Sequence, residues 1–471
     1  MSGHMKINPI IRLIILLSVM ALAACTVKPA APTPVPTTLP VSTTSPVSTL
    51  EITSTSLPTE TPVALKKVDA STMEHKLLMG YQGWFTCPGD GSLVNGYFHW
   101  FTGNVPDAGK LKVAMWPDTS ELTPGERCPT NMVLPNGQPA TLYSAYNPKT
   151  VMRHFEWMSQ YGIDGVFLQR FGSELSDPVF FDERNVVTKN VIAGAEATGR
   201  VFAIMYDTSN MDASTFVGEL ENDWKYLVDV LNVTESPSYL HQNGKPVVAI
   251  WGLGFTGHPG TPQQAMDLVK FFEKNPDPTL QVTLMGGVPT DWRTLQKDSL
   301  PDPGWSKYYC ALNVISPWTV ERFKSDVQVD QYKSTMLLDM AAASQCGAEY
   351  MPVVFPGFSN QNSGGSALNV TPRRGGNLYW RQVYNAVSIG VPMIYNAMFD
   401  EVDEGTAMYK IAATTNDQPV GVALVPLDAD GINLPSDWYL RLAGAATKML
   451  RGEIPLTINI PIQPGAATST P

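Results

Sequence analysis

Eight short runs of apolar and β-branched residues recur along the chain, and longer amphipathic stretches separate them. Short continuous apolar runs are typical of strands buried on both faces, as in a parallel sheet. The runs are LLMGYQ from Leu77, IDGVFLQ from Ile163, RVFAIMY from Arg200, PVVAIW from Pro246, QVTLMG from Gln281, ALNVIS from Ala311, MPVVFP from Met351 and VPMIYNA from Val391. A strand followed by a helix, repeated eight times in one domain, predicts an α/β protein with a (β/α)8 TIM barrel. An open doubly wound sheet is the alternative.

The stretches between these runs carry recognisable helix starts. Asn147 and Pro148 supply an N-cap and a proline at the first helical position, and apolar residues follow at helical spacing. Thr261 and Pro262 open a second helix in the same way. These starts support the strand and helix alternation.

The N-terminal segment has the pattern of an export signal. Lys6 and Arg12 precede an apolar run that is too short to span a bilayer and that ends at Cys25. The last residues of this run, LAAC, resemble a bacterial lipobox, which implies cleavage before Cys25 and lipid attachment to its sulfur. An ordinary signal with a cysteine at its end by chance is the alternative.

Composition divides the rest of the chain. Residues 25–67 are rich in Pro, Thr and Ser and contain no aromatic residue, so they predict a disordered tether. With a signal peptide over 1–24, the barrel domain is expected over 68–455 and a C-terminal tail over 456–471. The many aromatic residues, including 11 Trp, fit one large domain.

Charge and cysteine content restrict the partners and the compartment. The net charge is −11, which argues against nucleic acid or anionic lipid headgroups as partners. Four cysteines remain in the expected domain, and local grouping favours Cys87 with Cys128 and Cys310 with Cys346, although three connectivities are open. No close CxxC pair indicates a zinc site, and the carboxylate spacing matches no EF-hand, so no metal is assigned, with a structural calcium near Asp400–Glu404 left open. No organic cofactor is expected.

Residues at the strand ends are the first candidates for a functional site, because barrel chemistry lies at the C-terminal ends of the strands. These candidates are Tyr81, Trp84, Gln169, Arg170, Tyr206, Asp207, Trp251, Trp318, Tyr395 and Asn396. Aromatic rings and hydrogen-bonding groups together are typical of saccharide sites, since sugars offer apolar ring faces and hydroxyls.

Two further candidates lie outside the strand ends. His99 and Trp100 are expected either to form part of a sugar subsite or to pack a hairpin. Arg373 precedes the last helix before the eighth strand, where it is expected to orient substrate hydroxyls, to pair with a carboxylate, or to lie in a solvated turn.

The stretch AMFDEVDEGT, which follows the eighth run, places Asp400, Glu401, Asp403 and Glu404 within five positions. We call residues 397–407 the acidic loop. Glu401 and Glu404 are three residues apart and share a face if the loop turns helically, with Cβ atoms about 5–6 Å apart. Two close carboxylates repel, so one can stay protonated as an acid while the other acts as a base. A solvated acidic loop at a helix N-terminus is the alternative.

MFDEVDEGT resembles the W-N-E-W-x-E-G-T segment of family 99 glycoside hydrolases, the endo-α-mannosidase and endo-α-mannanase group with a (β/α)8 fold. It also resembles the broader family 71/99-like set, often labelled xylosidase/arabinosidase. Further segments support the broader set, and together they cover most of the chain from Met79 to Lys410. They are GYQGWF from Gly80, HW at His99, WPD from Trp116, YNPKTVMRHFEWMSQYGIDGVFLQRF from Tyr146 and VISPWTVERF from Val314.

The resemblance implies roles for both glutamates. Glu401 matches the family's base toward the sugar 2-hydroxyl, which attacks the anomeric carbon and gives a 1,2-anhydro sugar with retention. Glu404 matches the acid/base at the glycosidic oxygen. Phe399 and Val402 replace the family's tryptophans and Asp400 its asparagine, so α-mannan specificity does not carry over. Asp400 is kept as a substrate-binding candidate.

The sequence therefore predicts a glycoside hydrolase that is lipid-anchored outside the cytoplasm of a bacterial cell and acts as a monomer on a poly- or oligosaccharide. Its contact with the membrane is expected only through the lipid on Cys25. A catalytically inactive carbohydrate-binding lipoprotein is the competing hypothesis, because the residues around the two glutamates depart from the family pattern.

Overall fold

A computed structural model describes residues 67–465, and its central feature is a closed ring of parallel strands. The signal peptide, Cys25 and nearly all of the expected tether lie outside the described residues. The strands of the ring are β1 (Leu77–Tyr81), β4 (Gly165–Phe171), β5 (Val201–Asp207), β7 (Lys245–Trp251), β8 (Thr283–Val288), β9 (Val314–Pro317), β10 (Glu349–Tyr350), β11 (Val353–Val354) and β12 (Ile394–Asn396). Each of the eight apolar runs forms a strand position of this ring, which confirms the predicted (β/α)8 barrel.

One chain segment closes the ring by pairing on both sides. β10 pairs with β9, and β11, only three residues further on, pairs with β12. The order along the sheet is β10-β9-β8-β7-β5-β4-β1-β12-β11. Because β10 and β11 belong to the same extended segment, the ring has no free strand edge at this point.

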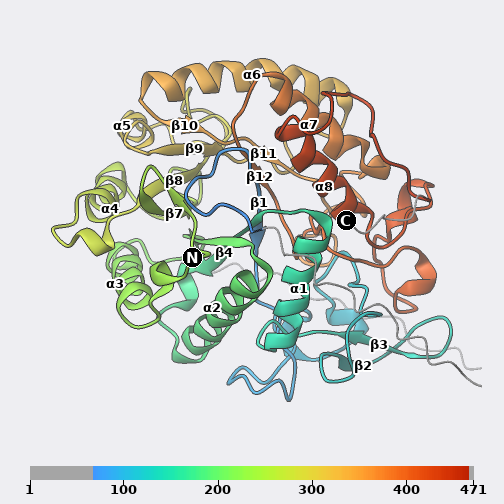
Figure 1. Ribbon diagram of the computed structural model, residues 1–471. Coiled ribbons are helices and arrows are strands. Elements are labelled where there is room, and N and C mark those ends of the chain that lie inside the picture. The colour runs from blue at the N-terminus through green and yellow to red at the C-terminus, as the bar shows by residue number, and fades with distance from the viewer. Residues whose placement is uncertain (1–66, 466–471) are drawn as a thin grey trace, which may run out of the picture. The chain divides into compact units, whose positions relative to one another are not determined.

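The helices surround the strands (Figure 1). They are α1 (Pro148–Tyr161), α2 (Pro178–Thr198), α3 (Phe216–Asp229), α4 (Pro262–Lys274), α5 (Gly304–Tyr309), α6 (Asp326–Gln345), α7 (Asn377–Ser388) and α8 (Trp438–Leu450). The expected starts of α1 and α4 are confirmed: the Asn147 side chain accepts from Lys149 N, and Thr261 forms a capping box with Gln264.

Alternation along each strand determines which side chains face the barrel interior. On β5, Phe202, Ile204 and Tyr206 pack toward the helices, whereas Ala203 and Met205 belong to the interior core. The same period of two applies on β1 and β4. At a strand end, therefore, two consecutive residues point in opposite directions: one side chain lies in the barrel mouth and the next lies between the strand and the helices.

A long excursion between β1 and α1 carries the antiparallel hairpin β2 (Cys128–Val133) and β3 (Pro139–Leu142). A disulfide joins Cys87 to Cys128, and a second joins Cys310 to Cys346 at the C-terminal ends of α5 and α6. Both are the local pairings that the sequence favoured. A short strand, β6 (His241–Gln242), pairs with β7 outside the ring.

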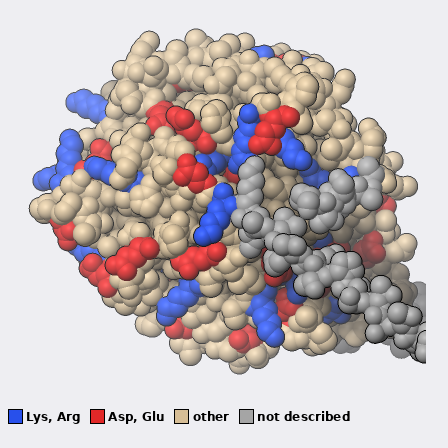
Figure 2. Space-filling view, in the orientation of Figure 1, with Lys and Arg blue, Asp and Glu red and all other residues tan. Residues whose placement is uncertain are grey.

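The described surface mixes both signs of charge. On the face drawn in Figure 2, the acidic and basic side chains of the described residues are interspersed, without an extended basic field. Among residues 67–465, no helix combines the length and the apolar character needed to cross a bilayer.

Candidate active site

The acidic loop follows β12 and crosses the end of β1, at the C-terminal mouth of the barrel. Its backbone is held in place, because Phe399 N donates to Gly80 O at 2.7 Å and the Val402 carbonyl accepts from Ala114 N and Met115 N. The side chains of Phe399 and Val402 are fully buried. The two departures from the family's tryptophans therefore serve packing.

Asp400 fastens the acidic loop to the end of β1. Its side chain is 1% exposed, and its two carboxylate oxygens accept from Gln82 N at 2.7 Å and Gly83 N at 3.0 Å. Burial raises the pKa of Asp400 to about 7, against the effect of these two donors. The substrate-binding role expected for Asp400 is not what this geometry provides, because both oxygens are occupied by backbone amides.

Glu401 is held by two hydrogen-bond donors. Gln82 Nε2 lies 2.5 Å from one carboxylate oxygen, and Thr406 Oγ1 donates to the other at 2.6 Å. Burial, followed by the charges of Glu404 and Asp403, raises the pKa of Glu401 well above its usual range. The two donors act in the opposite direction, because they stabilise the charged form.

Asp403 contacts a stack of aromatic rings. His99 Nδ1 lies 3.2 Å from an Asp403 oxygen, and the two groups form a hydrogen bond when Nδ1 carries the ring proton. The His99 ring stacks on Trp84 with centroids 3.7 Å apart, and Trp84 stacks on Phe171 at 4.6 Å. Burial raises the pKa of Asp403 to about 7, and it lowers the pKa of His99 well below its usual range.

Glu404 differs from the other three carboxylates. Within residues 67–465, no hydrogen bond or ion pair involves its side chain, which remains partly exposed. Its backbone is fixed, since Ser359 N donates to the Glu404 carbonyl at 2.9 Å. Burial, together with the charges of Asp403, Glu321 and Asp207, raises the pKa of Glu404 to about 8. The surroundings of Glu404 thus favour its protonated form.

The four carboxylates differ in their contacts. Asp400 accepts through both oxygens and Asp403 contacts His99 through one, whereas Glu401 and Glu404 form a neighbouring pair in which the charge of Glu404 raises the pKa of Glu401. A coupled pair of this kind shares a proton at intermediate pH. The two donors favour the charged form of Glu401, whereas Glu404 has no donor among the described residues, so these contacts favour the proton on Glu404.

Several predicted residues face the barrel mouth. Gln169 Nε2 donates to Tyr395 Oη at 3.1 Å, and the Tyr395 ring lies 6.3 Å from that of Trp318. Trp318 meets Trp251 edge to face at 5.4 Å. Asp207 ends β5 on the interior side, and burial raises its pKa to about 6. The structure brings these residues together around the carboxylate pair.

Other strand-end candidates point into the layer between strands and helices. Arg170 pairs with Asp223 on α3, and Tyr206 Oη donates to the same carboxylate at 2.8 Å. Tyr81 Oη lies 2.9 Å from His154 Nδ1, again on the helix side. Strand alternation directs these three side chains away from the mouth, and the expectation that they contact substrate beside the acidic loop is corrected accordingly.

Trp100 and Asn396 also lie in the interior. Trp100 is fully buried, its ring stacks on Phe85 at 4.0 Å, and Nε1 donates to Tyr143 O. The sequence left two alternatives for His99 and Trp100, a sugar subsite or a packing role. Trp100 packs within the segment between β1 and α1, whereas His99 contacts the acidic loop. The Asn396 side chain is fully buried at the end of β12.

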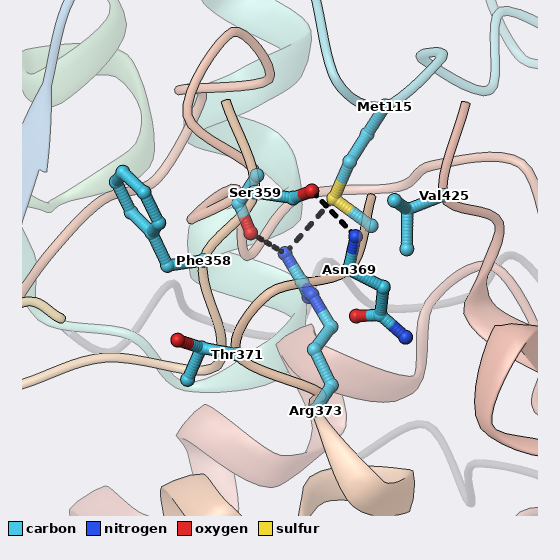
Figure 3. A pocket seen from close by; sticks show the side chains of 8 residues that line it. Met115, Phe358, Ser359, Asn369, Thr371, Arg373 and Val425 are labelled. Carbon is cyan, nitrogen blue, oxygen red and sulfur yellow. Dashed lines mark hydrogen bonds between the residues drawn. The ribbon is translucent and has the colours of Figure 1, made fainter. Parts of the chain in front are cut away.

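Arg373 supports the acidic loop from behind. Its Nη2 donates to the carbonyls of Gly405 at 2.9 Å and Ala407 at 2.7 Å, and its guanidinium lies 4.5 Å from the Tyr439 ring centroid. Figure 3 shows the side chain reaching toward Met115, among the residues that line a shallow pocket behind the loop. Arg373 thus holds the loop backbone, instead of pairing with Glu401 or Glu404 or lying in a solvated turn.

Two side chains that contact these carboxylates are not among the sequence candidates: Gln82 and Thr406, which fix Glu401. Asp403, which the sequence gives no role of its own, contacts His99. The alternation of side chains along β1 identifies Gln82. It follows Tyr81, which points toward the helices, so Gln82 points toward the barrel interior. In the described part of the chain, no three His, Cys, Asp or Glu side chains are grouped so as to hold a metal ion.

The fold has solved relatives. The structure is similar to that of the family 99 endo-α-mannosidase from Bacteroides thetaiotaomicron in complex with BIS-TRIS-propane, with a TM-score of 0.59 at 13% identity over 81% of this chain and 99% of that chain. A second structure of that enzyme gives a TM-score of 0.56 at 14% identity, with the same coverage. No protein-family model and no curated protein matches the sequence. At this identity the likeness is one of fold, and it agrees with the resemblance stated from the motifs.

Proposed function

We propose that this protein is a glycoside hydrolase that cleaves a poly- or oligosaccharide with Glu401 and Glu404. The observation that carries the proposal is the difference between these two neighbouring carboxyl groups at the barrel mouth. Glu404 has no partner among the described residues, and burial raises its pKa to about 8, whereas Glu401 is held by two donors. An acid and a base with separate environments are what glycoside cleavage requires.

In the proposed reaction, Glu404 donates its proton to the glycosidic oxygen as the bond to the anomeric carbon breaks. Glu401 accepts the proton of the sugar 2-hydroxyl, whose oxygen attacks the anomeric carbon and forms the 1,2-anhydro sugar. Water then attacks the anomeric carbon with Glu404 acting as the base, while Glu401 returns its proton to the 2-oxygen as the three-membered ring opens, which gives retention. Gln82 and Thr406 fix the position of Glu401 and stabilise the charge that it carries before the reaction.

The saccharide is proposed to lie between the two aromatic groups of the barrel mouth. One group is His99, whose ring stacks on the buried Trp84 next to Asp403, and the other is Trp251 with Trp318, which meet edge to face. Such rings bind the apolar faces of sugars. Gln169 and Asp207 are the polar groups that we assign to substrate hydroxyls, with no organic cofactor and no metal.

A carbohydrate-binding protein without turnover is the competing proposal. Its main support was the unusual surroundings of the two glutamates. However, Phe399 and Val402 are fully buried and Asp400 accepts from the end of β1, so these substitutions have structural explanations that leave Glu401 and Glu404 unaffected.

The test is reducing-sugar release by the chain from Lys66 onward on α-mannans, xylans, arabinans and glucans, beside Glu401→Gln and Glu404→Gln. We expect release from at least one polymer and its loss in both variants. Gel retardation by a polymer without release from any of them would instead establish the binding protein. The product's anomeric configuration, followed by NMR, tests retention.

We further propose that the protein is exported and anchored through a lipid on Cys25, as a monomer whose folded domain begins near residue 68. Two disulfides within the domain fit an oxidising compartment. Labelling of growing cells with a radioactive fatty acid should mark the wild type and leave Cys25→Ser unlabelled.

A further inference from the structure

A groove between α2 and α3 lies outside the site described above. Its volume is about 330 Å³, at the lower end of the range of roughly 300–1,000 Å³ that is usual for ligand pockets. It is lined by Leu175, Ser176, Phe181, Glu219, Asn222, Asp223 and Tyr226. We call it the α2/α3 groove.

Its walls combine aromatic rings with hydrogen-bonding groups. Phe181 and Tyr226 meet edge to face with centroids 4.9 Å apart, and both rings remain partly exposed. Glu219 and Asn222 supply a carboxylate and an amide on the same helix. This combination suits a saccharide, whose C–H face packs on a ring while its hydroxyls donate to and accept from the neighbouring polar groups.

The floor of the groove is a fixed ion pair. Asp223 is buried and accepts from Arg170 and from Tyr206, so its charge is compensated and its position is held by β4 and β5. Arg170 and Tyr206, which the sequence singled out and the acidic loop does not use, thus support this second surface. None of the residues that line the groove is Lys or Arg, and Glu219 remains, which disfavours an anionic saccharide.

The groove adjoins the aromatic stack of the acidic loop along the chain. Phe171, at the end of β4, stacks on Trp84, which in turn stacks on His99 next to Asp403. The 3-10 turn η3 (Gly172–Glu174) follows Phe171 directly and leads to Leu175 at the groove. The η3 turn therefore connects the aromatic stack to the lining of the groove.

We propose that the α2/α3 groove is a distal saccharide-binding subsite, which holds a part of a neutral or amino-bearing polysaccharide chain whose reacting linkage lies at the acidic loop. This inference rests on the proposed function for the identity of its ligand. It assigns binding, and no chemical step, to the groove.

The test uses Tyr226→Ala, which removes one ring, and Asn222→Trp, which fills the groove from an exposed position with little risk to folding. Tyr384→Ala is the matched control, because Tyr384 is a partly exposed tyrosine on α7 outside the groove. Thermal unfolding checks that all variants fold. We expect both groove variants to lower kcat/KM on the polymer by roughly three- to tenfold, as loss of one ring contact predicts, and to leave the shortest cleavable oligosaccharide unaffected.

Gel retardation in the Glu404→Gln background separates this inference from the proposed function. Weaker retardation of both groove variants than of Tyr384→Ala supports the subsite, even if the wild type releases no sugar. If the wild type cleaves a polymer but the groove variants match Tyr384→Ala in both assays, the subsite is wrong and the hydrolase stands. A wild type that neither binds nor cleaves any polymer overturns both.

Discussion

Replacing Gln82 by Met would remove one of the two donors that stabilise the charged form of Glu401. The Gln82 Nε2 group lies 2.5 Å from a buried carboxylate oxygen, and Met has a similar volume without the donor. A hydrogen bond to a charged group contributes about 1.5–3 kcal/mol, which corresponds to about a 10- to 150-fold change in an equilibrium. Because only the anion loses this bond, the pKa of Glu401 rises further above its usual range.

The expected result is a change in the shape of the pH profile. Glu401 must be ionised to accept a proton, so the acid limb of kcat/KM moves to higher pH, and activity on that limb falls by about 10- to 100-fold. The alkaline limb reports the loss of the Glu404 proton and should stay near pH 8, in line with a pKa of about 8. Near the optimum the fall should be smaller.

The assay is initial-rate kinetics between pH 4 and 9 on the polymer that the panel identifies. Gln382→Met is the matched control, since Gln382 is equally buried but bonds the backbone of Phe355. A side-chain ¹³C NMR titration, assigned with Glu401→Gln, measures the pKa without substrate. A uniform loss of activity at every pH, with an unmoved acid limb, would refute the role given to Gln82.

Four further changes test other parts of the structure. Stability should fall as the pH rises from about 4.5 to 8, because burial raises the pKa of Asp400, Asp403 and Glu404, so that the folded chain binds more protons than the unfolded chain in that range. Melting temperatures at pH 5 and 8.5 would show this difference, and Glu404→Gln should reduce it. Trp100→Ala should cost about 3–5 kcal/mol of unfolding free energy, measured by urea titration, because the ring is fully buried; a change in KM alone would contradict its placement in the core. Replacing Cys87 and Cys128 together by Ser should lower stability by about 2–4 kcal/mol, with dithiothreitol reproducing part of the effect on the wild type. Arg373→Met should lower kcat and the melting temperature together, because two buried loop carbonyls lose their donor, and an unchanged kcat would show that the loop keeps its shape without it.

The barrel could be predicted from the sequence because each of its strands is recognisable from adjacent residues alone. Each strand is buried on both faces, so its residues form a continuous apolar run. Such a run can be recognised in the sequence without knowing which strands pair with it. The starts of α1 and α4 were equally local, since an N-cap followed by proline is a property of adjacent residues. The favoured disulfide pairings follow the same rule, with partners 41 and 36 residues apart.

The site was harder to predict because it depends on which face of its strand each side chain points to, and on contacts between residues far apart in the sequence. Arg170 and Tyr206 end strands as expected, yet a single-residue alternation turns them toward α3. Asp400 is a substrate-binding candidate in the sequence, but its partners are backbone amides 317 and 318 positions earlier. Nothing in the local sequence distinguishes a carboxylate that accepts from a strand end from one that faces solvent.

The order of the acidic loop and its partners along the chain has a consequence for biogenesis. Gln82 precedes Glu401 by 319 residues, and His99 precedes Asp403 by 304, so the partners are synthesised first and the carboxylates almost last. Before β12 pairs with β1, the four carboxylates are solvated and ionise as ordinary surface acids. A nascent or truncated chain therefore has no acid and base pair, and competence for catalysis arises only when the ring is complete. A chain that follows the proposed export route would remain inert during synthesis and acquire its reactivity where it finishes folding.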